Sequence, residues 1–305
     1  MPFQKNLDLE HSKFFCYRGL MTCVALTPYE RVDPWKIVAM LFKGNIYLCA
    51  RDTEEKITRK RNMTPDEKKF ASWGYKFEQY MLSDTPETEP NPNVPVDETE
   101  EFSLVFKTHL NDHNIVYGAE MDGIRCDRGN VGPPPTHEWE AEAIVQYLST
   151  KEFIELKTSK QMENPKQETV FRRYKTKKWW CQSFLAGIDT VLCGLRNDVG
   201  IVDEIRMYKL RDLSKMSQKY WSPHVCFNFL DAFFTHVKTC LAYHIRQKHG
   251  ESALNNLQVL PLISLLFEWN PGMPVTVAGT YSNEDDPILH EQFISQFGKE
   301  DINKC

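Results

Sequence analysis

The chain of 305 residues contains no apolar run long enough to cross a membrane. Its apolar stretches, such as residues 259–267, are far shorter than the roughly 18 residues that a transmembrane helix requires. The opening residues, Met-Pro-Phe-Gln-Lys-Asn, also lack the apolar segment of a secretory signal peptide. These absences predict an intracellular protein.

Several motifs of common enzyme classes are missing as well. There is no G-x-x-x-x-G-K-[ST] loop and no G-x-G-x-x-G loop, so the usual signatures of ATPases and of nicotinamide-dependent enzymes are absent. The nine histidines form no H-E-x-x-H motif, and the nine cysteines, an odd number, form no C-x-x-C pair. We therefore expect reduced thiols rather than disulfides or zinc ligands.

Charge of one sign is not in large excess. The 42 acidic and 37 basic residues give a net charge of −5, which argues against a general electrostatic attraction to nucleic acid but leaves a local basic surface open. With 41% hydrophobic residues and no internal repeat, the chain is long enough to bury a large core. We predict one domain over residues 1–305.

Local patterns predict both strands and helices. Lys43-Gly44-Asn45 separates two apolar runs, which indicates a hairpin, and Thr64-Pro65-Asp66-Glu67 combines a capping box with a proline at the first helical position. The predicted elements are strands at 35–42, 46–51, 102–110, 114–122 and 151–157, a hairpin over 190–210, and helices at 165–174 and 177–186 and from residues 65 and 223 onward. Because strands and helices alternate without a strict βαβ rhythm, the predicted fold class is mixed α+β, with central mixed sheets flanked by helices.

Residues 84–101 differ from the rest of the chain in composition. They include seven acidic residues and four prolines but no basic residue. Such a segment disfavours a helix or a central strand, so an exposed loop is expected there.

Two carboxylates lie close together in the sequence at Glu120 and Asp122. Side chains alternate along a strand, so these two face one side while Tyr117, Ala119 and Met121 face the other. Adjacent carboxylates repel each other unless a cation, a basic partner or water lies between them. An isolated E-x-D is more often a solvated sheet face, so the pair needs support from elsewhere in the chain.

That support comes from Glu155 and Lys157, which share one face of another predicted strand. Acids on two strands with a lysine nearby are what a metal-dependent nuclease needs. Carboxylate oxygens hold Mg²⁺ or Mn²⁺, the metal offsets charge that develops on the phosphate, and the ammonium group orients or activates water. Taken alone, Glu155 and Lys157 are equally well explained as a surface ion pair.

A third acid, Glu78, falls at the edge of an apolar helical stripe formed by Phe70, Phe77 and Met81, from which it can reach inward. Gly74 lies on the same helical face as Glu78. It either lets a backbone or a ligand approach or merely accommodates packing. Without its neighbours, Glu78 is an ordinary boundary glutamate.

Residues 157–178 contain eight basic residues against two acidic ones, a local balance of +6. Trp179, Trp180 and Phe184 follow directly. Basic side chains bind phosphates and aromatic rings stack on bases, so this stretch, including Arg172 and Lys175, is predicted to bind substrate. The alternative is a solvated helix face whose tryptophans belong to the core.

Taken together, these stretches resemble the DXO family of RNA 5′-end decapping and exonuclease enzymes, whose fold is related to the PD-(D/E)XK nucleases. The resemblance covers roughly residues 14–270, and five short motifs occur in the family's order. They are Tyr17-Arg18-Gly19, Gly74-Tyr75-Lys76-Phe77-Glu78, Glu120-Met121-Asp122, Glu155-Leu156-Lys157, and Gln182 in Trp179-Trp180-Cys181-Gln182.

The resemblance implies a divalent cation, Mg²⁺ or Mn²⁺, with two ions when substrate is bound. The implied metal ligands are Glu78, Asp122, Glu155 and the Leu156 carbonyl, with Glu120 contributing directly or through a second ion or water. Lys157 and Gln182 would contact the scissile phosphate or its nucleophilic water, and Arg18 would help to hold the RNA 5′ end. The implied catalytic set is Glu120, Asp122, Glu155, Lys157 and Gln182, and the substrate-binding set is Arg18, Glu78, Lys157, Gln182, Arg172 and Lys175.

The implied activity is hydrolysis of triphosphate, incompletely capped or NAD-capped RNA 5′ ends, with 5′→3′ degradation, in RNA quality control in the nucleus, the cytoplasm or both. Arg18 lies nearer the N-terminus than in relatives, so part of the sheet or of the pocket wall is expected to be missing or rebuilt. One alternative is a non-catalytic protein that binds RNA ends or stabilises a nuclear 5′→3′ exoribonuclease. The acids weigh against this alternative, because a scaffold has no chemical need for converging carboxylates. A DNA nuclease on the same fold is the third possibility.

Overall fold

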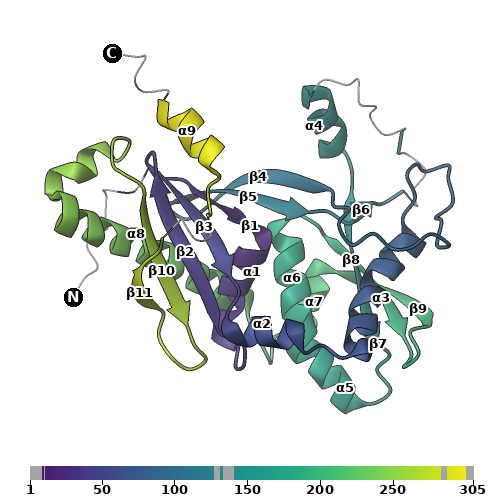
Figure 1. Ribbon diagram of the computed structural model, residues 1–305. Coiled ribbons are helices and arrows are strands. Elements are labelled where there is room, and N and C mark those ends of the chain that lie inside the picture. The colour runs from purple at the N-terminus through teal and green to yellow at the C-terminus, as the bar shows by residue number, and fades with distance from the viewer. Residues whose placement is uncertain (1–8, 10, 127–130, 133–140, 283–286, 300–305) are drawn as a thin grey trace. The chain divides into compact units, whose positions relative to one another are not determined.

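The computed structural model describes residues 9, 11–126, 131–132, 141–282 and 287–299 (Figure 1). Two mixed β-sheets and several helices confirm the predicted mixed α+β class. The chain divides into two compact units, the first formed by residues 1–61, 105–118 and 224–305 and the second by residues 62–104 and 119–223. A single functional domain over 1–305 stays a prediction.

The first unit is built on a seven-stranded sheet with the order β11-β10-β2-β3-β1-β5-β4. Its strands are β1 (Phe14–Tyr17), β2 (Trp35–Phe42), β3 (Asn45–Arg51), β4 (Ser103–Leu110), β5 (His113–Glu120), β10 (Ile263–Trp269) and β11 (Thr276–Thr280), and its helices are α1 (Arg18–Leu26), α2 (Glu54–Arg61), α8 (Pro223–His249) and α9 (Glu291–Lys299). The long helix α8 packs its apolar stripe on this sheet, where the ring of Phe234 lies 4.5 Å from that of Phe14. The predicted hairpin is confirmed, since β2 pairs antiparallel with β3 around Lys43 and Gly44.

The second unit contains a four-stranded sheet with the order β6-β7-β8-β9. Its strands are β6 (Gly123–Ile124), β7 (Phe153–Lys160), β8 (Thr190–Arg196) and β9 (Val202–Lys209), and its helices are α3 (Pro65–Met81), α4 (Ala141–Ser149), α5 (Pro165–Val170), α6 (Thr176–Leu185) and α7 (Leu210–Ser217). Strands β7 and β8 run parallel, whereas the pairs at both edges are antiparallel. The capping box that begins α3 is confirmed: the Thr64 side chain accepts from the Glu67 amide, and the Glu67 carboxylate accepts from the Thr64 amide.

The alternation of side chains along β7 divides its residues between two faces. Ile154 and Leu156 form a buried cluster with Phe77 of α3 on one face. Ser159, on the other face, accepts a hydrogen bond from Lys175, so that face is covered by the helical segment that runs from α5 to α6. Glu155 and Lys157 belong to the same face as Ser159. Glu155 is fully buried and Lys157 is half-buried on this face, whereas Lys160, on the other face, is exposed.

The helical segment from α5 to α6 is continuous. The predicted helices at 165–174 and 177–186 are both present, but a π-helical stretch over Phe171–Lys175 joins them without a break. Short π-helical stretches inside α-helices occur frequently at functional sites, because the wider turn redirects the side chains that it carries. Lys175 is the last residue of this stretch.

The role expected for two of the aromatic residues is wrong. Trp179 and Trp180 are 5% and 7% exposed, so they belong to the core and offer no ring to a substrate. The ring of Trp179 packs against Phe171, and Trp180 packs against Trp221. Only Phe184 of the three predicted rings is exposed, where it stacks on Trp180. Large aromatic rings are often buried, and here their burial in the core decides their role although basic residues lie next to them in the sequence.

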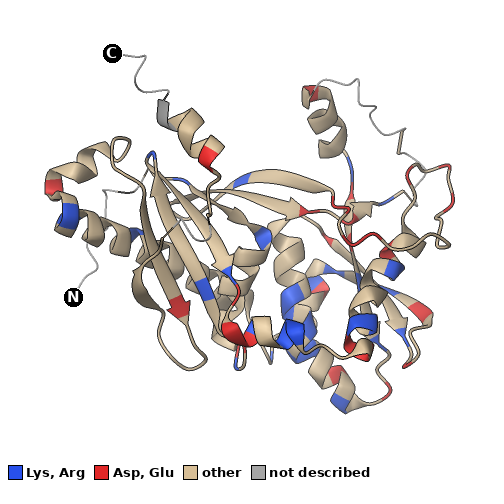
Figure 2. Ribbon diagram, viewed as in Figure 1, with Lys and Arg blue, Asp and Glu red and all other residues tan. Residues whose placement is uncertain are grey.

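The predicted loop over residues 84–101 is confirmed. Residues 84–101 contain no helix or strand, and Figure 2 shows acidic residues along this loop. The eight cysteines within the described part of the chain are free thiols. None of the helices in these ranges has both the length and the apolar character needed to span a bilayer.

Gly194 of β8 permits the close approach of α3. A Cβ atom at this position would lie 2.6 Å from Cε2 of Phe77, whereas nothing in the described ranges lies within 4 Å of a Cβ atom added at Gly74. We expect Gly194→Ala to lower the free energy of unfolding by about 1–3 kcal/mol through overpacking. Gly74→Ala is the matched control and should raise it by up to about 1 kcal/mol, because alanine favours a helix interior. Urea denaturation of both variants tests the opposite signs, and a destabilised Gly74→Ala protein would contradict the packing argument.

Candidate active site

Three charged side chains of the second unit meet at the start of its sheet. The Lys157 ammonium nitrogen Nζ lies 2.6 Å from Oε1 of Glu155 and 3.7 Å from Oδ2 of Asp122. The same Oδ2 atom accepts a hydrogen bond of 2.6 Å from the backbone amide of Leu156. Asp122 therefore contacts Lys157 and the Leu156 amide, which come from a different stretch of the chain.

Local strand pairing explains how Asp122 reaches this point. The sequence predicts a strand over residues 114–122, but β5 ends at Glu120. Asp122 therefore lies just beyond the strand. Gly123 then pairs with Ile154 of β7, which places Asp122 beside the Leu156 amide. The predicted alternation is nevertheless confirmed, because Tyr117, Ala119 and Met121 are all buried.

Burial distinguishes this cluster from a surface ion pair. Glu155 is 0% exposed, and the side chains of Asp122 and Lys157 are 7% and 23% exposed. Burial by itself lowers the pKa of Lys157, but Glu155, Asp122 and Glu78 outweigh it, so the pKa is raised and the ammonium stays charged. The explanation of Glu155 and Lys157 as a solvated pair is therefore wrong.

Glu78 of α3 lies within electrostatic reach of the same cluster. Its pKa is raised from 4.5 to about 7, first by burial and then by Asp122, Glu120 and Glu155, with Lys157 acting in the opposite direction. The predicted inward reach of Glu78 is consistent with these interactions. Glu120 is exposed, at the end of β5.

The chemistry of these residues fits a hard divalent cation. Carboxylate and carbonyl oxygens are the ligands that Mg²⁺ and Mn²⁺ prefer. Asp122 and Glu155 contact one ammonium group and Glu78 lies in electrostatic reach of it, so the acids outnumber the cation and their negative charge favours a further cation. Among the described residues, no three Asp, Glu, His or Cys side chains stand at ligand spacing, and the Lys157 ammonium contacts both Asp122 and Glu155. The ligand roles of Glu78, Glu120, Asp122, Glu155 and Leu156 stay predictions.

Two other predicted residues lie on helices. Gln182 is half-buried on α6, the helix that packs against β8. Arg18, the first residue of α1, is 7% exposed in the first unit, where its charge acts on Tyr117. Their contacts with substrate stay predictions.

The predicted basic surface is partly neutralised. Figure 2 shows Lys and Arg gathered on the segment from α5 to α6. Arg172 forms an ion pair with Glu168, and Lys160 of β7 forms one of 2.6 Å with Asp198. Lys177 is 7% exposed, with its ammonium group over the Tyr174 ring. The local balance of +6 therefore overstates the charge that is available to a ligand.

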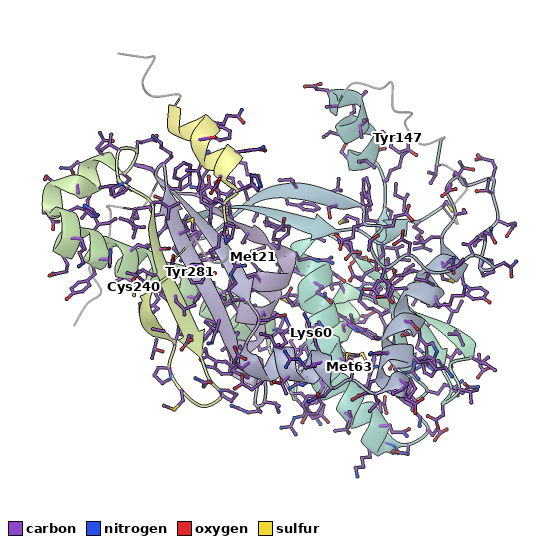
Figure 3. All side chains as sticks on the ribbon, in the orientation of Figure 1. Met21, Lys60, Met63, Tyr147, Cys240 and Tyr281 are labelled. Atoms are coloured by element: carbon purple, nitrogen blue, oxygen red, sulfur yellow. The ribbon has the colours of Figure 1, made fainter. Side chains whose placement is uncertain are left out.

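A cavity of about 430 Å³ opens beside Asp122. Its walls are mainly apolar and include Phe102, Ile124, Phe153 and Tyr147, of which Tyr147 lies on α4 (Figure 3). The sequence did not predict this cavity. Its lining residues come from separate stretches of the chain, and apolar residues of this kind cannot be told from core residues by sequence.

The titration of Glu78 predicts how the stability of the metal-free protein depends on pH. Its folded pKa of about 7 exceeds the ordinary 4.5, so its stabilising contribution is complete below about pH 4.5 and is lost as the pH rises to about 7. Glu78→Gln cannot ionise and should therefore equal the unchanged protein near pH 4.5 but exceed it by about 1–2 kcal/mol at pH 8, after allowance for solvent screening.

Urea denaturation in EDTA at the two pH values measures this difference. Glu163→Gln, at an exposed position of the same unit, is the control and should show no pH-dependent gain. A Glu78→Gln difference that is the same at both pH values would contradict the proposed electrostatic cause.

Comparisons with known proteins identify the relatives of this chain. Residues 3–285 match the model of the family described as RAI1 like PD-(D/E)XK nuclease. The chain is 30% identical over 285 residues to the Decapping and exoribonuclease protein of Xenopus laevis, an alignment that covers 92% of this chain and 63% of the frog protein. The chain thus spans about three fifths of the length of the curated relatives that it matches.

Two crystal structures have the same fold at low sequence identity. They are Candida albicans Rai1 in complex with pU5-Mn²⁺ and Scheffersomyces stipitis Rai1 in complex with (3′-NADP)⁺ and calcium ion. Each has a TM-score of 0.68 and 19% identity to this chain, and each comparison covers 94% of this chain and 74% of the other.

Proposed function

The chain belongs to the family of RAI1-like PD-(D/E)XK nucleases, and we propose that it is a divalent-metal-dependent hydrolase of RNA 5′ ends. The observation that carries this proposal is the buried contact of Asp122, Glu155 and Lys157, with Glu78 in electrostatic reach. A buried group of acids is unfavourable for stability and has a clear use in phosphate chemistry.

Each residue of the cluster has a separate role in this proposal. Glu78, Glu120, Asp122, Glu155 and the Leu156 carbonyl would hold Mg²⁺ or Mn²⁺, with two ions when substrate is bound. The cation supplies Lewis-acid stabilisation of phosphate charge and lowers the pKa of a bound water. The Leu156 amide fixes the orientation of the Asp122 carboxylate. Lys157 would contact the scissile phosphate and offset its developing negative charge, and Gln182 would orient the nucleophilic water.

The cavity beside Asp122 supports action at the end of an RNA. Its apolar and aromatic walls suit the base of a 5′-terminal nucleoside better than a phosphate chain. The substrates would be triphosphate, incompletely capped or NAD-capped ends, followed by 5′→3′ degradation. The Rai1 complexes with (3′-NADP)⁺ and with pU5 support this substrate class. Arg18 would help to hold the 5′ end.

The biological setting is also a proposal. RNA quality control in the nucleus, the cytoplasm or both would require this activity, and a nuclear 5′→3′ exoribonuclease would be a natural partner. A purely binding protein is the alternative, but such a protein would gain nothing from the buried acids.

Hydrolysis of defined RNAs tests the proposal. One RNA sequence is prepared with a triphosphate, an NAD cap or an incomplete cap, alongside a circular form and a matched DNA. We expect products only from linear RNA ends, only with Mg²⁺ or Mn²⁺, and none in EDTA. Equal cleavage of circular RNA or of DNA would contradict end-specific RNA hydrolysis, and RNA binding without any product would favour the binding protein.

A further inference from the structure

A second cavity lies at the opposite end of β7 from the apolar one. It has a volume of about 460 Å³ and is lined by residues of β7, α5, the π-helical stretch and the loop that follows β7, among them Ser159, Gln161, Met162, Lys175 and Phe171. Its size falls within the range of roughly 300–1,000 Å³ that is typical of small-molecule sites. The two cavities therefore flank Glu155 and Lys157 along one strand.

Lys175 gives this cavity a fixed positive charge. Its Nζ donates a hydrogen bond of 3.1 Å to Oγ of Ser159, which is 3% exposed. The Ser159 hydroxyl in turn donates to the backbone carbonyl of Lys160, so its orientation is set. An ammonium group has three N–H donors, and this contact uses one of them.

Within the part of the chain that the structure describes, the charge of Lys175 is not balanced by an acid. Across the described ranges, no carboxylate forms an ion pair with Lys175, in contrast to Lys160 and Arg172. Burial and the charge of Arg196 lower its pKa, and Cys193 acts in the opposite direction. The Lys175 side chain is exposed, so an anion can reach it, and an ammonium group forms charge-assisted hydrogen bonds with an anion such as a phosphate.

The remaining walls suit the rest of a nucleotide. Met162, Val170 and Phe171 provide apolar surface, and the side-chain amides of Gln161 and Gln167 provide polar groups. Ser159 lies two residues from Lys157 on the same face of β7, a separation of about 7 Å along the strand. This separation is comparable to that of neighbouring phosphates in an extended single strand.

We propose that this cavity binds the RNA phosphate that follows the scissile one, with Lys175 as its cationic ligand and Ser159 as the residue that positions Lys175. The inference rests on the proposed function, because it takes Lys157 to lie at the scissile phosphate. We assign this cavity to the downstream RNA because every following nucleotide carries a phosphate that Lys175 can bind. The apolar cavity at the other end of β7 suits the base of the 5′-terminal nucleoside instead.

A charge-removal experiment on both partners tests this contact. Lys175→Met removes the charge but keeps most of the stem, and Lys178→Met is the matched control at an exposed position of the same helix. Two five-nucleotide RNAs are compared, one natural and one with an uncharged methylphosphonate at the linkage after the scissile one. Binding is measured by fluorescence anisotropy in EDTA, where cation-dependent hydrolysis is stopped.

We expect Lys175→Met to weaken binding of natural RNA about tenfold, and the methylphosphonate to weaken binding by the unchanged protein to a similar extent. The two changes together should be no worse than either alone, because both remove the same contact. The slope of log K against log salt should fall by about 0.7 in Lys175→Met. Lys178→Met should leave the response to the methylphosphonate unchanged.

Additive effects of the two changes would overturn the proposal, as would no detectable binding by the unchanged protein. Because the binding assay does not depend on hydrolysis, its result is distinct from that of the activity test. Non-additive binding effects without hydrolysis would support the phosphate site and contradict the catalytic function. Hydrolysis with additive binding effects would support the catalytic function and contradict the phosphate site. With active protein, Lys175→Met should raise KM and leave kcat unchanged.

Discussion

Asp122→Asn is expected to lower the rate of hydrolysis of RNA 5′ ends about a thousandfold. The carboxylate is one of the proposed metal ligands, and loss of one charged ligand removes several kcal/mol of stabilisation from the transition state. Asparagine keeps an oxygen that can accept from the Leu156 amide, so the local fold should survive. Measurement of kcat/KM with Mn²⁺, alongside the melting temperature, separates the catalytic effect from unfolding.

Asp189→Asn is the matched control for this prediction. Asp189 belongs to the same unit but forms a surface ion pair with Lys209, and its side chain is 65% exposed. Its replacement should change neither rate nor melting temperature measurably. If Asp122→Asn retained more than about a tenth of the activity, Asp122 would not be a metal ligand, whatever the outcome for the control.

Patterns that depend on a few neighbouring residues were predictable from the sequence. The capping box at Thr64 fixed the start of α3 because its two hydrogen bonds are made within four residues. The alternation along β7 correctly placed Glu155 and Lys157 on one face because the strand period is two. The apolar stripe of α8 was visible for the same kind of reason.

Properties that depend on distant partners were not predictable. Strand β1 is four residues long and is defined by its parallel partners β3 and β5, which lie far away in the sequence. The burial of Glu155 depends on the helix that covers its face, and no local pattern reports such a cover. For Trp180 the same limitation led to a wrong expectation, since its burial depends on Trp221.

One residue of the second cavity could have been placed from the sequence. Ser159 continues the alternation of Glu155 and Lys157, so its position on the site face followed from the strand period. Its partner Lys175 was expected to bind substrate on account of local charge alone. Only the hydrogen bond between them, and the ion pairs that neutralise Lys160 and Arg172, distinguish Lys175 from the other cations of the stretch.

Lys157→Met is expected to affect both stability and activity. The Glu155 carboxylate is fully buried, and the Lys157 ammonium lies 2.6 Å from it. Removal of one member of a buried ion pair leaves a charge in a medium of low polarity, which costs about 3–5 kcal/mol. We therefore expect the free energy of unfolding in EDTA at pH 7.5 to fall by about 3 kcal/mol, with hydrolysis lowered at least a hundredfold.

A second substitution separates these two effects. Glu155→Gln combined with Lys157→Met replaces the charged pair by a neutral one of similar volume, so most of the lost stability should return. Hydrolysis should remain at the level of the single variant or below it, because a metal ligand and the phosphate-binding cation are then both absent. Urea denaturation and kcat/KM measured on the two single variants and the double variant complete the cycle. A double variant that stayed as unstable as Lys157→Met would show that the ammonium supports the fold through packing of its stem, and recovery of activity would remove Glu155 and Lys157 from the proposed catalytic set.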